Sequence, residues 1–285
     1  MSDLDSTIEA GLRTLSAHED ARAAALANVR EWLTDDRLSA YRPYIEQMAS
    51  RADWGLVLDS FWRMMPFGTG GRRGPVGAGP NRINPFTIQL SVQGHCQYLR
   101  EVVGLTGEIS VVVAYDVREF HDLRGLYTGV TGPLSGLTSR DMARQCATTY
   151  AANGVVAYVV GPLEQEGGTP PATDRFISTP ELSFLIRELG AAGGLNISAS
   201  HNHPDDNGGK FYNRQGGQEV PPHDEALLDV VEKVTDVEEM PYALARERSL
   251  IRIVPAELHE RYIEVNTALC PTDSRSARVA FTPLC

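Results

Sequence analysis

The residues around Ser200 combine a nucleophile, a candidate base and a cation. The stretch SASHNHPDDNGGKFY places His201 next to Ser200 and Lys210 ten positions further on. A serine hydroxyl is a weak nucleophile at its ordinary pKa, so it needs a base, an electrostatic partner or a metal. His201 could supply the base and Lys210 the charge. The alternative is that Ser, His and Asn cap a turn, which is the commoner role of these residue types taken singly.

The same stretch also contains residue types that bind metals. His201 and His203, together with Asp205 and Asp206, could provide nitrogen and oxygen ligands. Neighbouring loop residues without a helical or distant partner are a poor basis for a metal site. A metallohydrolase is therefore kept only as a minor alternative.

A second candidate segment, residues 67–84, reads FGTGGRRGPVGAGPNRIN. It contains no GxGxxG dinucleotide motif, and we expect it to form a long loop. Its glycines could leave backbone N–H groups free to bind an anion, and Arg72, Arg73 and Arg82 could bind phosphate through paired hydrogen bonds. A solvated surface loop is the alternative interpretation.

The elements that position these residues alternate between strands and helices. Buried strands are predicted at Ile109–Tyr115, Val155–Val160 and Leu195–Ala199, because each is an apolar or β-branched run. This pattern predicts an α/β fold with a mainly parallel mixed sheet flanked by helices. Ligands of such sheets bind beyond the carboxyl ends of the strands. Both Asp116 and Ser200 follow such an end.

Asp116 begins a third candidate segment, Asp-Val-Arg, at the end of the first predicted strand. Asp116 and Arg118 could form a salt bridge that closes the strand end. Arg118 could equally reach the cleft expected at Ser200.

The helices between the strands are predicted from their caps and apolar faces. Residues 1–65 are expected to be helical, with a capping box formed by Ser16 and Glu19. Further helices are expected from Thr138 to Asn153, from a Thr179 cap to Gly190, after Pro221 and Pro222, and over Glu257–Thr267; a last strand is expected to start over Arg278–Thr282.

Composition limits the class of partner. The chain has 285 residues and a net charge of −11, which argues against nucleic-acid binding. No apolar stretch approaches the roughly 20 residues of a membrane span, and the acidic start is unlike a secretory signal. The four cysteines, Cys96, Cys146, Cys270 and Cys285, are widely scattered, which favours a reducing, cytoplasmic location.

Three of these segments together resemble one family. FGTGGRRG (Phe67–Gly74), YDVR (Tyr115–Arg118) and SASHNHPDDNGGKFY (Ser198–Tyr212) occur in the order and rough spacing of the α-D-phosphohexomutases. These are the phosphoglucomutases, phosphomannomutases and their relatives. The GPNRIN stretch and the helical extension resemble the phosphoglucomutase/phosphopentomutase branch most. The resemblance covers residues 25–284 approximately.

The resemblance implies an intramolecular phosphotransferase that acts on small-molecule sugar phosphates. Ser200 would carry the phosphoryl group, with His201 and Lys210 assisting proton transfer. The substrate contacts would be Thr69, Arg73, Arg118 and Asn202. Residues 1–65 would be an extension, 66–275 domain I, and 276–285 the truncated first strand of domain II.

The resemblance also implies Mg²⁺ bound at the phosphate of Ser200, and a sugar bisphosphate as activator. The Asp-x-Asp-x-Asp-Arg metal loop and the Gly-Glu-Glu-Ser sugar-selecting loop of the family are absent from the sequence, and His203 replaces the usual proline. We therefore expect a truncated chain that is inactive alone. A catalytically silent sugar-phosphate-binding module is the alternative of a different class.

Overall fold

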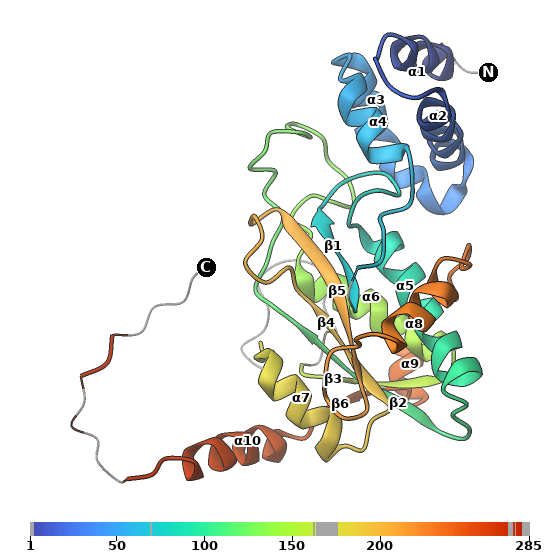
Figure 1. Ribbon diagram of the computed structural model, residues 1–285. Coiled ribbons are helices and arrows are strands. Elements are labelled where there is room, and N and C mark those ends of the chain that lie inside the picture. The colour runs from blue at the N-terminus through green and yellow to red at the C-terminus, as the bar shows by residue number, and fades with distance from the viewer. Residues whose placement is uncertain are drawn as a thin grey trace.

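A mixed six-stranded sheet with helices on both faces forms the body of the molecule (Figure 1). The computed structural model describes residues 3–68, 70–161, 163, 176–272, 276 and 278–280. The strand order is β1 (Gly71–Pro75), β5 (Asp206–Asn213), β4 (Gly193–Ile197), β2 (Ile109–Tyr115), β3 (Val155–Val159) and β6 (Ile251–Ile253). β4, β2, β3 and β6 are parallel, whereas β5 runs antiparallel to both β1 and β4. The predicted fold class is confirmed.

Two sets of helices cover the sheet. One face is covered by α5 (Pro85–Gln97), which continues into the π-helical turn η2 (Tyr98–Val102), and by α6 (Ser139–Ala152), α8 (His223–Val231) and α9 (Tyr242–Glu247). The other face carries α7 (Thr179–Glu188), against which the peripheral α10 (Ala256–Ala268) packs. The central strands are therefore buried on both faces, as their β-branched sequences require.

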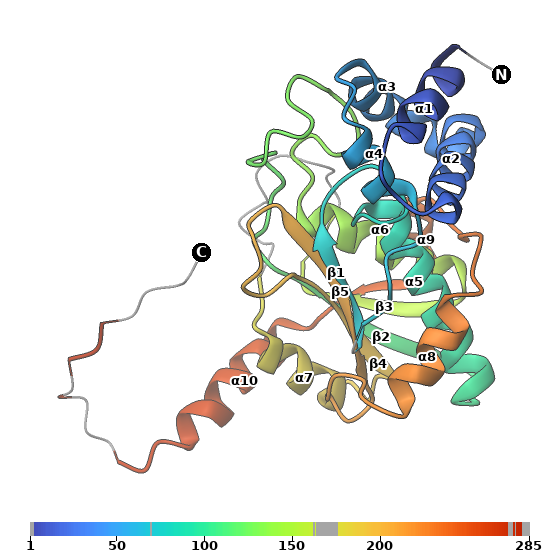
Figure 2. The same cartoon turned by 45° about the horizontal axis from the view of Figure 1, so that its top comes forward.

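The N-terminal extension is helical, as predicted, and lies beyond one end of the sheet (Figure 2). It comprises α1 (Asp3–Arg13), α2 (Glu19–Thr34), the 3₁₀ turn η1 (Asp36–Tyr41), α3 (Arg42–Ser50) and α4 (Trp54–Phe61). Trp32 joins it to the α/β body, because its ring makes edge contacts with Phe61 of α4 and Phe86 of α5. The predicted capping box at Ser16 and Glu19 is wrong. α2 begins at Glu19 itself, and its N-cap, His18, makes no side-chain cap.

Several element predictions are confirmed with small shifts. β2 has the predicted bounds, and the helix after Thr138 has the capping box with Asp141. The cap of α7 is Ser178, one residue before the predicted Thr179, because the Ser178 hydroxyl accepts the N–H of Glu181. β4 begins and ends two residues before the predicted strand.

The prediction of one long loop over residues 67–84 is wrong, since β1 lies within it. A strand also occupies part of the glycine-rich stretch after Ser200, namely β5. Both strands owe their close pairing to glycine. A Cβ at Gly71 would lie 2.0 Å from the carbonyl oxygen of Gly209, and one at Gly208 would lie 2.2 Å from that of Arg72. The glycines that suggested loops are thus what lets these backbones approach.

Other predictions concern the end of the chain. Residues 278–280 take part in no strand pairing, and residues 281–285 lie outside the described part, so the strand expected to start there stays a prediction. The predicted domain boundaries at residues 65 and 275 likewise stay predictions. No helix within the described ranges is long and apolar enough to cross a membrane.

Candidate active site

Ser200 lies in the tight turn between β4 and β5, just beyond the carboxyl end of β4. Its φ is +57°, in the left-handed region that costs a non-glycine residue about 1 kcal/mol or more. The Ser200 N–H donates to the hydroxyl oxygen of Ser198 at 3.1 Å, and the residue itself is exposed. His201 Nδ1 lies 3.4 Å from Ser200 Oγ. The turn therefore presents the hydroxyl to solvent with an imidazole beside it.

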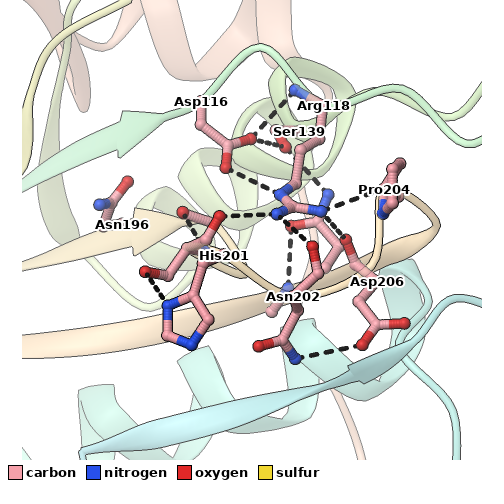
Figure 3. Close-up of polar contacts among 12 residues, drawn as sticks. Asp116, Arg118, Ser139, Asn196, His201, Asn202, Pro204 and Asp206 are labelled. Carbon is pink, nitrogen blue, oxygen red and sulfur yellow. Dashed lines mark hydrogen bonds and ion pairs between the residues drawn. The ribbon is translucent and has the colours of Figure 1, made fainter. Parts of the chain in front are cut away.

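Arg118 lies inside this turn rather than at an open face (Figure 3). Its guanidinium donates to backbone carbonyl oxygens along the loop, at Ser200 (2.7 Å), Asn202 (3.1 Å), His203 (2.7 Å), Pro204 (3.3 Å) and Asp206 (3.0 Å). The side chain is 8% exposed. Both terminal nitrogens of Arg118 bind the loop, and its predicted contact with substrate stays a prediction.

Asp116 fixes the other side of Arg118. Its carboxylate lies 3.3 Å from Arg118 Nε and accepts the hydroxyl hydrogen of Ser139 at 2.6 Å. The Ser139 oxygen in turn accepts from the side-chain amide of Asn207, at 2.9 Å. This chain of contacts ties together the end of β2, the start of α6 and the start of β5. The salt-bridge interpretation of Asp116 and Arg118 is the one that the structure supports.

Lys210 lies in the middle of β5, opposite Asn196 of β4 and Gly71 of β1. It is buried, and burial is the main cause that lowers its pKa, followed by the nearby positive charge of Arg73. The charge of Asp116 acts in the opposite direction, and that of Arg118 lowers the pKa further. Lys210 is thus electrostatically coupled to both arginines and to Asp116, which follows β2 and lies beside the loop that contains Ser200 (residues 198–206, the serine loop).

Arg73 of β1 lies beside β5, where it pairs with Gly208. A Cβ at Gly208 would lie 2.8 Å from Arg73 Cγ, so the glycine makes room for this side chain. Arg73 is exposed and has no hydrogen bond or ion pair with the rest of the described chain. Its guanidinium is therefore available to an anionic ligand. Arg72, by contrast, points the other way, is fully buried and donates to the carbonyl oxygen of Thr87 at 3.3 Å.

Two other residues that the sequence suggested for the site, Asn202 and Arg82, bind carboxylates of the protein itself. Asn202 donates to the Asp206 carboxylate at 3.1 Å, within its own loop. Arg82 pairs with Asp59 near the helical extension. Thr69 lies outside the described residues, so its predicted substrate contact stays a prediction.

The acidic residues of the loop are occupied by structural contacts. Asp205 accepts the backbone N–H groups of His121 (3.3 Å) and Arg124 (3.2 Å), and Asp206 pairs with the Arg124 guanidinium at 2.7 Å. The ring nitrogen Nδ1 of His203 accepts the N–H of Asp205. No group of three or more His, Cys, Asp or Glu side chains able to hold a metal occurs in the described part of the chain. The ligand set suggested for a metallohydrolase is therefore not assembled.

Sequence reasoning did not single out Ser139, Asn207 or Arg124. Ser139 could have been found, because the Thr138–Asp141 capping box places it at the first helical position, facing the strand ends. Asn207 and Arg124 carry no such local pattern. Their roles depend on segments far away in the sequence.

The structure is therefore an α/β protein with an exposed serine, next to a histidine, in the loop beyond a strand end, where sheets of this kind bind ligands. Comparison with known proteins agrees. Residues 136–238 match the family model of phosphoglucomutase/phosphomannomutase, alpha/beta/alpha domain I. The chain belongs to the α-D-phosphohexomutase family.

Individual relatives are similar over most of this chain. A phosphopentomutase of Mus musculus is 30% identical over 225 residues, which cover 79% of this chain and 32% of the relative. A phosphoglucomutase of Staphylococcus saprophyticus is 31% identical over 228 residues, covering 79% and 35%. The solved structure of parafusin, a Paramecium phosphoglucomutase, superposes with a TM-score of 0.50 at 18% identity, over 73% of this chain and 35% of that one, which shows a shared fold. The chain spans about a third of the length of these relatives.

Proposed function

We propose that this chain is the phosphoserine-bearing part of a sugar-phosphate mutase, with Ser200 as the phosphoryl carrier. The observation that carries the proposal is the presentation of the Ser200 hydroxyl in a left-handed turn, beside His201. The names of the relatives support the class of substrate, since they include phosphopentomutases and phosphoglucomutases. Small sugar phosphates are the substrates, and a sugar bisphosphate is the activator.

In the proposed reaction, phosphoserine 200 transfers its phosphoryl group to a hydroxyl of the sugar monophosphate. The Ser200 O–P bond breaks, a sugar O–P bond forms, and the proton that the sugar hydroxyl loses ends on Ser200 Oγ. The resulting bisphosphate turns over and returns its other phosphoryl group to Ser200. In that second step the serine hydroxyl loses its proton and the sugar oxygen gains one, so the two steps together are balanced.

The chain supplies charge and proton acceptors for these steps. Arg73 binds a phosphate of the sugar through its free guanidinium. Lys210 and His201 assist proton transfer. A lowered pKa makes the amine of Lys210 a more accessible proton acceptor than an ordinary lysine, because less free energy is needed to discharge it.

Mg²⁺ is the metal that the family resemblance implies, and the phosphate on Ser200 would be one of its ligands. Mg²⁺ binds oxygen ligands and is usually held by carboxylates together with phosphate oxygens and water. The carboxylates nearest the loop, Asp205 and Asp206, are already bound to N–H groups and to Arg124. The described residues therefore do not fit the ion. We propose that turnover requires carboxylates that these residues do not supply, and that this chain alone is inactive.

Phosphoryl loading tests the proposal. The purified chain is incubated with Mg²⁺ and glucose 1,6-bisphosphate, and intact-mass spectrometry followed by peptide mapping locates any phosphoryl group. We expect one group on Ser200 and none on Ser200→Ala. A phosphoryl group on Ser198, or none while a full-length relative is loaded under the same conditions, contradicts the proposal.

The same samples distinguish a mutase from the alternative function, a catalytically silent module that binds sugar phosphates. It would bind glucose 1-phosphate in a calorimeter through Arg73, yet gain no mass. A cytoplasmic location stays a prediction from the scattered cysteines, three of which, Cys96, Cys146 and Cys270, are free thiols.

A further inference from the structure

One guanidinium organises the whole serine loop. The five carbonyl oxygens bound by Arg118 belong to residues 200, 202, 203, 204 and 206, so the loop is wrapped around a single cation. Converging carbonyl oxygens repel one another unless a donor lies between them. A planar guanidinium, which has five N–H donors in a fixed fork, can serve several of them at once, whereas a lysine ammonium has only three.

The orientation of that guanidinium is set from outside the loop. Asp116 accepts the backbone N–H of Arg118 at 3.1 Å and faces its Nε at 3.3 Å. Ser139 and Asn207 hold the Asp116 carboxylate from α6 and β5. The Arg118 guanidinium is therefore held in place by residues of the sheet and of α6, independently of its contacts with the serine loop.

The contact with Ser200 is the shortest of the five together with that to His203, at 2.7 Å. Ser200 needs such a contact, because a serine does not adopt φ +57° without surrounding structure that holds it there. Arg118 binds the carbonyl of Ser200 itself and that of Asn202, on the C-terminal side of the strained residue. This pair of contacts holds the backbone from which the Ser200 side chain projects.

We propose that Arg118 is the positioning residue of the phosphoryl carrier: it holds the serine loop from within and does not bind substrate. The inference rests on the proposed function of Ser200 only for its effect on phosphoryl transfer. Its structural part, the ordering of residues 200–206 by one cation, is independent of that function.

Arg124 provides a matched control. It contacts the same loop through the Asp206 carboxylate, at 2.7 Å, and its guanidinium binds none of the five carbonyls. Arg124→Gln therefore removes an arginine from the loop without removing the internal cation. Arg118→Gln and Arg118→Lys both remove the forked N–H donors of the guanidinium, whereas only the lysine variant keeps the positive charge.

The first measurement is hydrogen exchange of the loop amides. The N–H groups of Ser200, Asn202 and Asp206 are hydrogen-bonded within the loop and can exchange only when it opens. We expect about a hundredfold faster exchange in Arg118→Gln, since several charge-assisted hydrogen bonds are lost. Arg124→Gln should change it by about threefold or less. Equal exchange in wild type and Arg118→Gln overturns the proposal, and so does an equal loss of protection in the core strand β2, which would mean global destabilisation.

The second measurement is the rate of Ser200 loading from glucose 1,6-bisphosphate. We expect a fall of about a hundredfold in Arg118→Lys, little change in Arg124→Gln, and partial recovery of Arg118→Ala when guanidinium ion is added at millimolar concentration. Recovery by guanidinium, which a purely destabilised protein would not show, supports positioning. Loading of Arg118→Lys at the wild-type rate overturns it. If wild type itself is not loaded while Arg118→Gln shows the faster loop exchange, the proposed function fails and the positioning role stands.

Discussion

At the scale of single residues, Lys210 combines a buried position with two cationic neighbours. Burial and Arg73 both disfavour its charged form. We predict that Lys210→Met leaves the melting temperature unchanged or raises it, because methionine fits the buried stem and removes the desolvated charge. Phosphoryl loading of Ser200 should nevertheless fall by about a hundredfold or more.

The lowered pKa of Lys210 also predicts how the stability of wild type changes with pH. Because the pKa of Lys210 is lower in the folded state, its unfavourable contribution is complete below that folded pKa and disappears as the pH rises toward the unfolded value. Wild type should therefore gain stability relative to Lys210→Met at alkaline pH. Thermal unfolding of both proteins between pH 7 and 10 measures this. A melting temperature of Lys210→Met several degrees below wild type at pH 7 contradicts the prediction.

Arg73 should affect binding without affecting stability. It is exposed and has no partner in the described part of the chain, so we predict that Arg73→Ala melts within a degree or two of wild type. Its affinity for glucose 1-phosphate, measured by calorimetry, should fall by about 10- to 100-fold, the value of a charge-assisted contact. Arg63→Ala is the control, because Arg63 lies over the Trp62 ring in the N-terminal extension. Equal losses of affinity in both variants would contradict the assignment.

A third residue, His95, should contribute to the loss of folding stability at acidic pH. His95 is fully buried in α5, 2.8 Å from the Tyr150 hydroxyl, and burial lowers its pKa to about 3. Below the unfolded pKa of about 6.5, the unfolded state binds a proton that the folded state does not. Stability should fall by about 1.4 kcal/mol per pH unit from this residue between about pH 6 and 4.

Urea unfolding of His95→Gln tests that slope. Glutamine can still form a hydrogen bond with the Tyr150 hydroxyl but does not titrate, so the difference between the two curves isolates the histidine. We expect the free energies of unfolding to converge as the pH falls from 7 to 4. Parallel curves over that range would show that His95 does not contribute.

At the scale of elements, the central parallel strands could be predicted from sequence, whereas the antiparallel pair β1 and β5 could not. β2 and β3 are β-branched runs buried on both faces, so local composition determines them. β1 and β5 have the sequences GRRGP and DNGGKFYN, which have no strand preference. Their strand conformation comes from pairing: β5 pairs with both β4 and β1, and its contact with β1 joins segments far apart in the chain.

The candidate site divides in the same way. Ser200, His201 and Lys210 form a motif within one short stretch, so the sequence could single them out as candidates. The role of Arg118 could not be predicted, because its partners lie 82 to 88 positions further on. Only the fold shows that its guanidinium binds the loop itself.

Two glycines of this region should respond very differently to alanine. Gly208→Ala would place a Cβ 2.2 Å from the backbone oxygen of Arg72, and neither backbone can move without breaking the pairing of β1 and β5. We predict a loss of about 2–4 kcal/mol in the free energy of unfolding. Gly217→Ala is the control, since its nearest neighbours would be 3.6 Å away. Urea unfolding of both variants measures the difference, and similar losses would refute the steric explanation.

At the scale of the whole molecule, the chain should show no appreciable mutase turnover by itself. The described residues offer no metal cluster, and each electrostatic element of such a site is commonly worth about a hundredfold or more in rate. A coupled assay of glucose 1-phosphate conversion, with Mg²⁺ and glucose 1,6-bisphosphate, tests this. Robust turnover that disappears in Ser200→Ala would prove the prediction wrong.

The pairing of β1 with β5 also has a consequence for synthesis. Gly71 pairs with Lys210, so β1 leaves the ribosome 139 residues before its partner. At about 5–20 residues per second this interval is roughly 7 to 28 seconds, during which β1 has no strand to join. Two arginines, two glycines and a proline make it a poor template for other chains, as unpaired edges need to be. The residues that let β1 pair closely with β5 are thus also residues that disfavour aggregation of an unpaired strand.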